Sequence, residues 1–262
     1  MKKFVLILIS LLLVLVSCTE SNPSGSISDD KINLDDVREQ INYANTDLVK
    51  GLIHVKTTSY NTGILGNITT YSSKGGTGVI FYEDEFFYYY ITNNHVTYIE
   101  DGFNHVSYEG YDCYCEKYES TLLFNDANYD LSILKMKKGT KSLHVFKRAQ
   151  TNPSPEDIII SMGHPNNVIN VVTIGYIENY QGLTIVDGDP VLSNVTFPII
   201  KHNAPTDSGS SGGALINLNY ELVGINYACL EKDDKFIASY SVPIEKVNEF
   251  LNNTIFKVNT NE

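Results

Sequence analysis

From Gly51 onward the sequence is a succession of short runs rich in β-branched and aromatic residues, separated by turn residues. There are about thirteen runs: LIHVKT, GTGVIFY, EFFYYYIT, HVSYEGY, STLLF, LSILKM, DIIISMG, NVVTIGYI, GLTIVDG, VTFPIIK, GALINL, ELVGINYACL and FIASYSV. Their spacing is short and fairly regular, whereas a βαβ protein alternates strands with helical segments. The pattern therefore predicts an all-β sandwich or barrel.

A looser stretch from Lys137 to Glu156, containing Pro153 and Pro155, interrupts these runs. It divides them into two sets of about six strands each. We therefore expect two packed six-stranded antiparallel β-barrels, at about residues 51–140 and 150–243.

Short helices are expected on either side of the strands. Residues 33–50 have apolar side chains at helical spacing and predict one short helix. The segment PIEKVNEFLN, residues 243–252, begins with proline and carries Ile244, Val247 and Leu251 on one face. It predicts a short closing helix at the C-terminal end.

The amino terminus has the pattern of an export signal. Lys2 and Lys3 precede an apolar run, residues 4–16, that is too short to span a bilayer. The run ends in LVSC, which resembles the lipobox of bacterial lipoproteins and implies cleavage after residue 17 and lipid on Cys18. A plain secretory signal is the alternative. Residues 18–36 include TESNPSGSISDD and predict a flexible tether to the outer face of the cytoplasmic membrane.

The charge balance argues against a nucleic-acid partner. The chain carries 19 Lys and Arg against 31 Asp and Glu, a net charge of −12, and no basic run is longer than Lys137-Lys138. Such an acidic body has no electrostatic attraction to anionic lipid, so membrane association would depend on the anchor at Cys18.

Three cysteines follow the predicted signal: Cys113, Cys115 and Cys229. The Cys-x-Cys pair rarely meets disulfide geometry, and one further cysteine does not complete a four-ligand zinc site. A structural role is favoured, and a bridge from Cys229 to one of the pair stays open. No metal or cofactor is expected.

The segment DSGSSGGAL, residues 207–215, is the sharpest local feature. A nucleophilic serine needs small neighbours that leave room for a substrate carbonyl and let backbone N–H groups point at an oxyanion. The same composition is also typical of an ordinary Gly/Ser turn.

A base and an acid precede that segment. His95 stands in YITNNHV, where an aromatic strand ends, and Asp130 stands in YDLSILK, immediately before an apolar strand. Taken alone, the histidine reads as a structural residue and the aspartate as a solvated one. Together with a serine, in the order His, Asp, Ser and at strand ends, they are what acyl transfer requires.

At these residues the chain resembles the trypsin-fold serine proteases, most closely the bacterial HtrA/DegP-like branch. The resemblance covers nearly all of residues 51–251. It rests on eight motifs in order: GTGVI (76–80), TNNHV (92–96), DLSILK (130–135), MGHP (162–165), VTIGYI (172–177), GSSGGAL (209–215), ELVGINYA (221–228) and SVP (241–243).

The resemblance implies a trypsin-like domain at residues 37–258 and serine endopeptidase activity on protein or peptide substrates. It implies that Ser211 is the nucleophile, His95 the general base and Asp130 its orienter. The oxyanion hole falls at Gly209, Ser210 and Ser211, with the N–H groups of the first and last as donors.

Family logic also outlines a substrate pocket, and the expected lining residues are Pro205, Thr206, Ile225, Asn226, Tyr227 and Ser241. The uncharged Pro205 at the pocket base offers no partner to a basic side chain. Cleavage after small or medium aliphatic residues is therefore expected.

Two departures and two alternatives accompany the resemblance. Ser210 replaces the Asn or Asp usual before the nucleophile, so zymogen activation through that acid is not supported. The chain ends soon after Asn253, so the PDZ modules of many HtrA-like proteins are expected to be absent, and the oligomeric state is open. The alternatives are a catalytically silent surface binding protein of this fold and a glutamyl endopeptidase, against which Asn226 counts because those enzymes carry histidine there.

Overall fold

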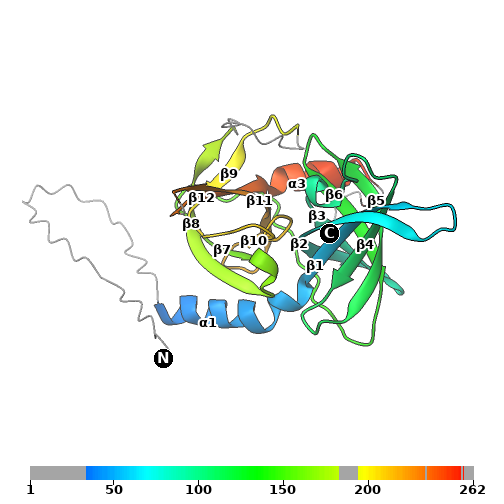
Figure 1. The fold of residues 1–262 in the computed structure, drawn as a ribbon. Helices are drawn as coiled ribbons and strands as arrows, with labels where there is room; N and C mark the ends of the chain where they lie inside the picture. The colour runs from blue at the N-terminus through cyan, green and yellow to red at the C-terminus, as the bar shows by residue number, and fades with distance from the viewer. Residues whose placement is uncertain (1–33, 183–193, 234, 255, 257–262) are drawn as a thin grey trace, which may run out of the picture. The chain divides into compact units, whose positions relative to one another are not determined.

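The computed structural model describes residues 34–182, 194–233, 235–254 and 256 (Figure 1). The predicted signal, residues 1–17, the lipidation site Cys18 and most of the tether lie outside the described residues. So does most of the expected strand at residues 182–188.

Six strands form the first barrel, and its strand order is β1-β2-β3-β6-β5-β4, closed by pairing of β4 with β1. Every neighbouring pair is antiparallel. The strands are β1 (Leu52–Thr62), β2 (Ile68–Glu83), β3 (Phe87–Thr92), β4 (His105–Tyr111), β5 (Lys117–Asp126) and β6 (Leu131–Lys137).

Six further strands form a second closed antiparallel barrel in the order β10-β11-β12-β9-β8-β7. They are β7 (Ile158–Gly163), β8 (Val171–Gln181), β9 (Ile199–His202), β10 (Ala214–Ile216), β11 (Leu222–Lys232) and β12 (Lys235–Pro243). The predicted pair of six-stranded antiparallel barrels is therefore confirmed.

Helices are few and short. They are α1 (Leu34–Thr46), η1 (Leu48–Gly51), α2 (Asn94–Thr97), η2 (Pro165–Asn167) and α3 (Ile244–Asn252). The closing helix is where the sequence predicted it, and its apolar side chains are buried. The first helix starts at Leu34, so it includes the last residues of the predicted tether. Among the described residues, no helix is both long and apolar enough to span a bilayer.

The apolar runs of β2, β3 and β6 are buried on both faces. Ile80, Tyr90 and Leu134 are paired neighbours across these three strands and fill the interior of the first barrel. The adjacent row Val79, Ile91 and Ile133 is also paired, but it belongs to the core cluster that contains the second barrel's side chains. Because successive side chains of a strand point to opposite faces, one row packs the barrel and the next packs the contact between barrels.

Candidate active site

His95 is carried into the inter-barrel region by the end of β3. The strand stops at Thr92, Asn93 keeps an extended backbone, and the chain then makes the single turn of α2. The hydroxyl of Thr97 is 2.7 Å from that of Ser132, which ties this turn to the start of β6. The His95 side chain is 28% exposed, so its ring is open to solvent on one side.

Asp130 holds the imidazole with both carboxylate oxygens. Its Oδ2 lies 2.7 Å from His95 Nδ1, and its Oδ1 accepts the backbone N–H of the same histidine at 2.9 Å. The carboxylate is fully buried, and Asp130 has a left-handed φ of 51° in the turn before β6. A carboxylate on Nδ1 favours the tautomer with the proton on that nitrogen, which leaves Nε2 as an acceptor.

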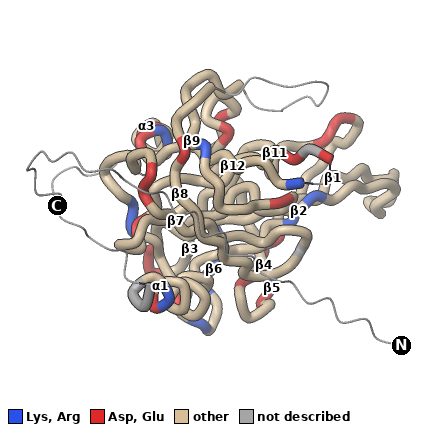
Figure 2. Tube along the Cα trace, turned by 90° about the vertical axis from the view of Figure 1, so that its left-hand side faces the viewer, with Lys and Arg blue, Asp and Glu red and all other residues tan. Residues whose placement is uncertain are grey.

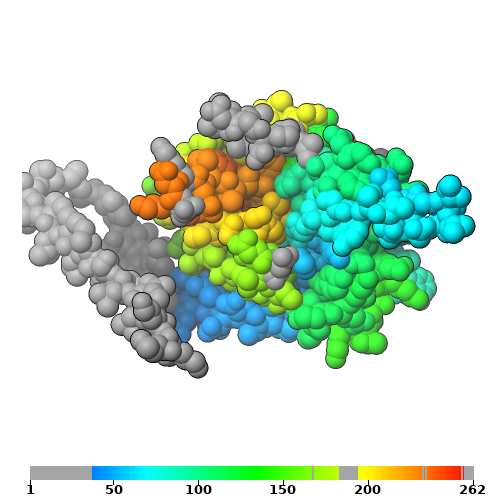
Figure 3. All heavy atoms as spheres, in the orientation of Figure 1, coloured from blue at the N-terminus to red at the C-terminus, as the bar shows by residue number. Residues whose placement is uncertain are grey.

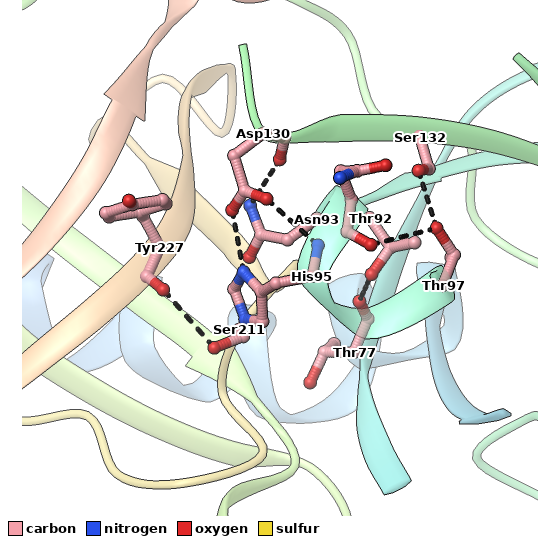
Figure 4. Close-up of polar contacts among 10 residues, drawn as sticks. Thr77, Thr92, Asn93, His95, Thr97, Asp130, Ser132, Ser211 and Tyr227 are labelled. Carbon is pink, nitrogen blue, oxygen red and sulfur yellow. Dashed lines mark hydrogen bonds and ion pairs between the residues drawn. The ribbon is translucent and has the colours of Figure 1, made fainter. Parts of the chain in front are cut away.

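Ser211 comes from the second barrel and meets this pair at the barrel contact. Figure 4 shows the imidazole of His95 lying between Asp130 and Ser211. Within the described part of the chain, the Ser211 hydroxyl makes its hydrogen bond to the carbonyl of Tyr227, at 3.3 Å, and not to His95. The structure therefore brings all three predicted triad residues together, with the Asp-His bond formed and the Ser-His bond not formed.

Two glycines allow the turn around Ser211 to adopt its shape. Gly209 has φ of 94° and Gly212 has φ of 83°, a region that residues with side chains rarely adopt. A Cβ on Gly212 would lie 2.0 Å from the carbonyl oxygen of Thr77, and one on Gly209 would lie 2.7 Å from that of His164. Both positions therefore require glycine.

The backbone N–H groups of Gly209 and Ser211 make no hydrogen bond within the described residues. The backbone N–H of Ser210, in contrast, donates to the Asp207 carbonyl at 2.9 Å. The Ser210 N–H therefore closes the turn, and the N–H groups of Gly209 and Ser211, which the resemblance implies as oxyanion donors, stay without an acceptor among the described residues.

Thr77, on β2 of the first barrel, fastens this turn. Its N–H donates to the Ser211 carbonyl at 2.8 Å and its hydroxyl donates to the Gly209 carbonyl at 2.8 Å. The same hydroxyl accepts the His164 N–H at 3.0 Å, and the Thr92 hydroxyl donates to the Thr77 carbonyl (Figure 4). The N–H groups of the same two peptide units belong to Ser210 and Gly212, and they donate to the carbonyls of Asp207 and Asn226, so both peptide planes are fixed. Sequence reasoning included Thr77 in a motif but gave it no role.

The residues expected to line the substrate pocket differ in how far they are exposed to solvent. Pro205 is exposed, whereas Ile225, Asn226 and Ser241 are at most 2% exposed and belong to the interior of the second barrel. A bulge at Tyr227 on β11 changes which side chains face inward, and sequence alternation alone does not locate it.

Thr206, a predicted pocket residue, makes a contact that the sequence did not reveal. Its hydroxyl is 2.7 Å from that of Ser239 on β12. Ser239 is in turn the pairing partner of Cys229 on β11, two residues beyond the carbonyl that holds Ser211. Thr206 is thus linked to the β11–β12 pair, in which the Tyr227 carbonyl accepts the Ser211 hydroxyl.

A buried polar network lies beneath these residues. Asn226 Nδ2 donates to Ser161 Oγ at 2.9 Å, and its Oδ1 accepts the Ser241 hydroxyl at 3.2 Å. Because the Ser241 hydroxyl donates its hydrogen to Asn226, the Ser241 oxygen acts as the acceptor for the N–H of His202 Nε2, which lies 3.0 Å away. Burial lowers the pKa of His202 to about 4.

The three described cysteines, Cys113, Cys115 and Cys229, are free thiols, so no bridge joins Cys229 to the pair. Asp207, Cys229 and Glu231 place potential metal-ligand atoms within 4.8 Å of one another. The Asp207 carboxylate is already engaged by Asn166 Nδ2 and by the Ser208 N–H.

Comparison with known proteins agrees with this arrangement. The family model for the trypsin-like peptidase domain matches residues 76–225. The chain is 34% identical over 178 residues to the probable periplasmic serine endoprotease DegP-like of Buchnera aphidicola subsp. Baizongia pistaciae, covering 66% of this chain and 35% of that protein. It is 25% identical over 231 residues to the serine protease Do-like HtrA of Bacillus subtilis, covering 84% of this chain and 48% of that protein.

A two-barrel fold with a histidine, an aspartate and a serine at the barrel contact defines a trypsin-like serine peptidase scaffold. The chain belongs to the trypsin-like peptidase family, and its relatives include HtrA/DegP-like serine proteases. It spans about a third to a half of the length of these curated relatives.

The buried histidine predicts a pH-dependent stability. An exposed histidine has a pKa of about 6.5, so between pH 6.5 and 4 the unfolded chain binds a proton that folded His202 does not. The free energy of unfolding should therefore fall as the pH drops through this window, by up to about 1.4 kcal/mol per pH unit. Urea unfolding at pH 7 and pH 5 measures it. His202→Gln should reduce this loss and His105→Gln, at an exposed histidine, should not; equal losses in both variants would contradict the assignment.

Proposed function

We propose that this chain is a serine endopeptidase in which His95, Asp130 and Ser211 form the catalytic triad. The observation that carries the proposal is the Asp130–His95 pair of one barrel set against Ser211 of the other. Two unengaged N–H groups, those of Gly209 and Ser211, adjoin that serine. Each group that acyl transfer needs is thus present within one contact region.

In the proposed first step, the Ser211 hydroxyl turns from the Tyr227 carbonyl toward His95 Nε2. The imidazole takes its proton as Ser211 Oγ attacks the substrate carbonyl carbon, and buried Asp130 stabilises the imidazolium that results. The N–H groups of Gly209 and Ser211 donate to the oxyanion that develops on the carbonyl oxygen.

Collapse of this intermediate breaks the peptide C–N bond, and the imidazolium gives its proton to the leaving amine. A water molecule then attacks the acyl-enzyme with His95 again acting as base. Neither step calls for a cofactor or a metal ion.

We further propose cleavage after small or medium aliphatic residues. Support comes from three short, uncharged side chains that we assign to the wall of the pocket: Thr206, Cys229 and Ser239. Cys229 lies two residues after Tyr227, whose carbonyl accepts the Ser211 hydroxyl. The hydroxyls of Thr206 and Ser239 bond to each other, so neither is left without a hydrogen-bond partner when a small apolar side chain lies beside them. An acidic side chain would meet the carboxylates of Asp207 and Glu231, which lie within 4.8 Å of Cys229 Sγ.

Export with a lipid anchor on Cys18 completes the proposal. It is supported by the LVSC pattern and by the word "periplasmic" in the name of the Buchnera relative. Mass spectrometry of the mature amino terminus should find diacylglycerol-modified Cys18. A mature chain that begins elsewhere, or that carries an unmodified Cys18, would refute the anchor.

Ser211→Ala should abolish covalent labelling by an organophosphonate serine probe and lower the rate of peptide hydrolysis by several orders of magnitude, because triad members act as a unit. Ser210→Ala is the matched control, since Ser210 is adjacent and buried but its backbone N–H keeps the turn. It should retain labelling. Labelling that survives in Ser211→Ala and disappears in Ser210→Ala would identify a different nucleophile.

Cleavage-site mapping on a denatured protein should give mostly cuts after Ala, Val or Leu. Cys229→Phe adds bulk opposite Ser239 and should reduce cuts after Leu more than cuts after Ala. Cys113→Phe, in a turn of the first barrel, is the control and should leave the profile unchanged. A majority of cuts after Arg, Lys or Glu would show that other residues form the pocket.

A further inference from the structure

The hairpin of β1 and β2 extends from the first barrel as an arm with an apolar tip. Figures 1 and 3 show this arm in cyan, projecting away from the barrel. The tip side chains are among the most exposed of the described residues: Ile64 at 106%, Leu65 at 94%, Tyr71 at 71% and Ile68 at 57%. Isolated exposed apolar residues are common, but four on one hairpin tip form a patch that calls for an explanation.

The arm is held in this position by specific contacts. Asn61 Nδ2 donates to the Gly102 carbonyl at 2.9 Å, and its Oδ1 accepts the Asn104 N–H at 3.0 Å. The ring of Tyr60 stacks on His105, with centroids 5.2 Å apart, and Lys74 Nζ lies over the ring of Tyr98. These contacts keep the apolar tip in water instead of letting it fold onto the barrel.

The tip itself is a closed turn. The Gly63 N–H donates to the Asn67 carbonyl at 2.8 Å, and the Gly66 N–H donates to the Gly63 carbonyl at 2.9 Å. These two bonds pair the Gly63 and Gly66 N–H groups inside the turn, which lowers the cost of moving the tip out of water.

The arm carries very little charge. The chain has 31 acidic residues, yet none lies between Thr57 and Tyr82, and Lys74 is the one charged residue in that interval. Figure 2 shows the arm beyond the β1 and β2 labels in tan, with acidic segments elsewhere. The arm thus carries no carboxylate that an anionic membrane surface would repel.

The size of the patch decides between a protein and a lipid partner. A stable protein interface uses roughly 20–30 residues on each side, and the tip offers four side chains. A bilayer needs no matching surface, because apolar side chains enter it individually while tyrosine rings remain at the interface. Tyr71, three residues from Ile68 and paired with Tyr60 across the strands, occupies that position.

We propose that the β1–β2 tip, with Ile64 and Leu65 at its end, inserts into the interface of a lipid bilayer. The inference extends the proposed membrane location: the residues from Thr19 to Leu34 reach at most about 55 Å, so a domain anchored at Cys18 stays beside lipid. The anchor would restrict the domain to the membrane surface, and the tip would set its orientation there. Because β2 continues from the tip to Thr77, that orientation would also set which way the active site faces.

A tryptophan at the tip tests this directly, because the chain contains none. Leu65→Trp, made in the mature full-length chain on vesicles of phosphatidylethanolamine and phosphatidylglycerol, should show a blue-shifted emission. Lipids brominated in their acyl chains should quench it. Ile237→Trp is the matched control, since Ile237 is an exposed isoleucine on β12 of the other barrel. It should be quenched several-fold less, and adding Ile64→Asp to Leu65→Trp should lower the quenching at the tip.

Equal quenching at both positions, or none at the tip, would overturn the proposal. A tip tryptophan protected from aqueous acrylamide but not quenched by brominated lipid would also overturn it, since a second protein copy would then cover the tip. Probe labelling of Ser211 in the same samples reports the peptidase separately. The vesicle measurement applies whether or not Cys18 carries lipid, so each failure can be recognised on its own.

Discussion

The apolar contact between the two barrels is the interaction on which the site depends. One paired row of the first barrel, Val79, Ile91 and Ile133, packs in the core cluster that contains the second barrel's side chains. The interior of the first barrel is filled by the adjacent row, Ile80, Tyr90 and Leu134. The strands that supply this row continue directly into the site: β3 leads to His95, and β6 starts after Asp130. A shift of one barrel against the other would separate the base from the serine while leaving each barrel folded.

Hydrogen bonds across the same contact between the barrels fix the shape of the turn around Ser211. Thr77 reaches from the first barrel to two carbonyls of the turn, those of Gly209 and Ser211, and so fixes two peptide planes of the turn. The N–H groups of Gly209 and Ser211 have no acceptor among the described residues. Electrostatic stabilisation of this kind depends on donors that are positioned before the reaction begins. The buried carboxylate of Asp130 likewise holds the His95 ring in a fixed position. A hydrogen bond between Ser211 and His95 would require only that the Ser211 hydroxyl rotate from the Tyr227 carbonyl toward the imidazole.

Buried polar groups in the second barrel are paired with one another. Beneath the nucleophile, Asn226, Ser161, Ser241 and His202 satisfy most of one another's hydrogen bonds inside the second barrel, where unpaired groups would be costly. At the far end of β2 the opposite holds, since Ile64 and Leu65 are kept in water on a braced hairpin. The buried network thus belongs to strands β7, β9, β11 and β12 of the second barrel, whereas the exposed tip belongs to the first barrel.

The sequence alone predicted the two barrels and the closing helix, and it singled out His95, Asp130 and Ser211, which the structure brings together. Strand runs, turn residues and motif order are local properties, and a local pattern is enough to specify them. Tertiary structure alone decided what those residues touch. Ser210 closes the turn through Asp207, Thr77 holds the turn from the other barrel, and Ile225 faces inward because β11 bulges at Tyr227. Each of these contacts joins residues through hydrogen bonds or a register shift between strands, and such pairings form only when the barrels close and pack.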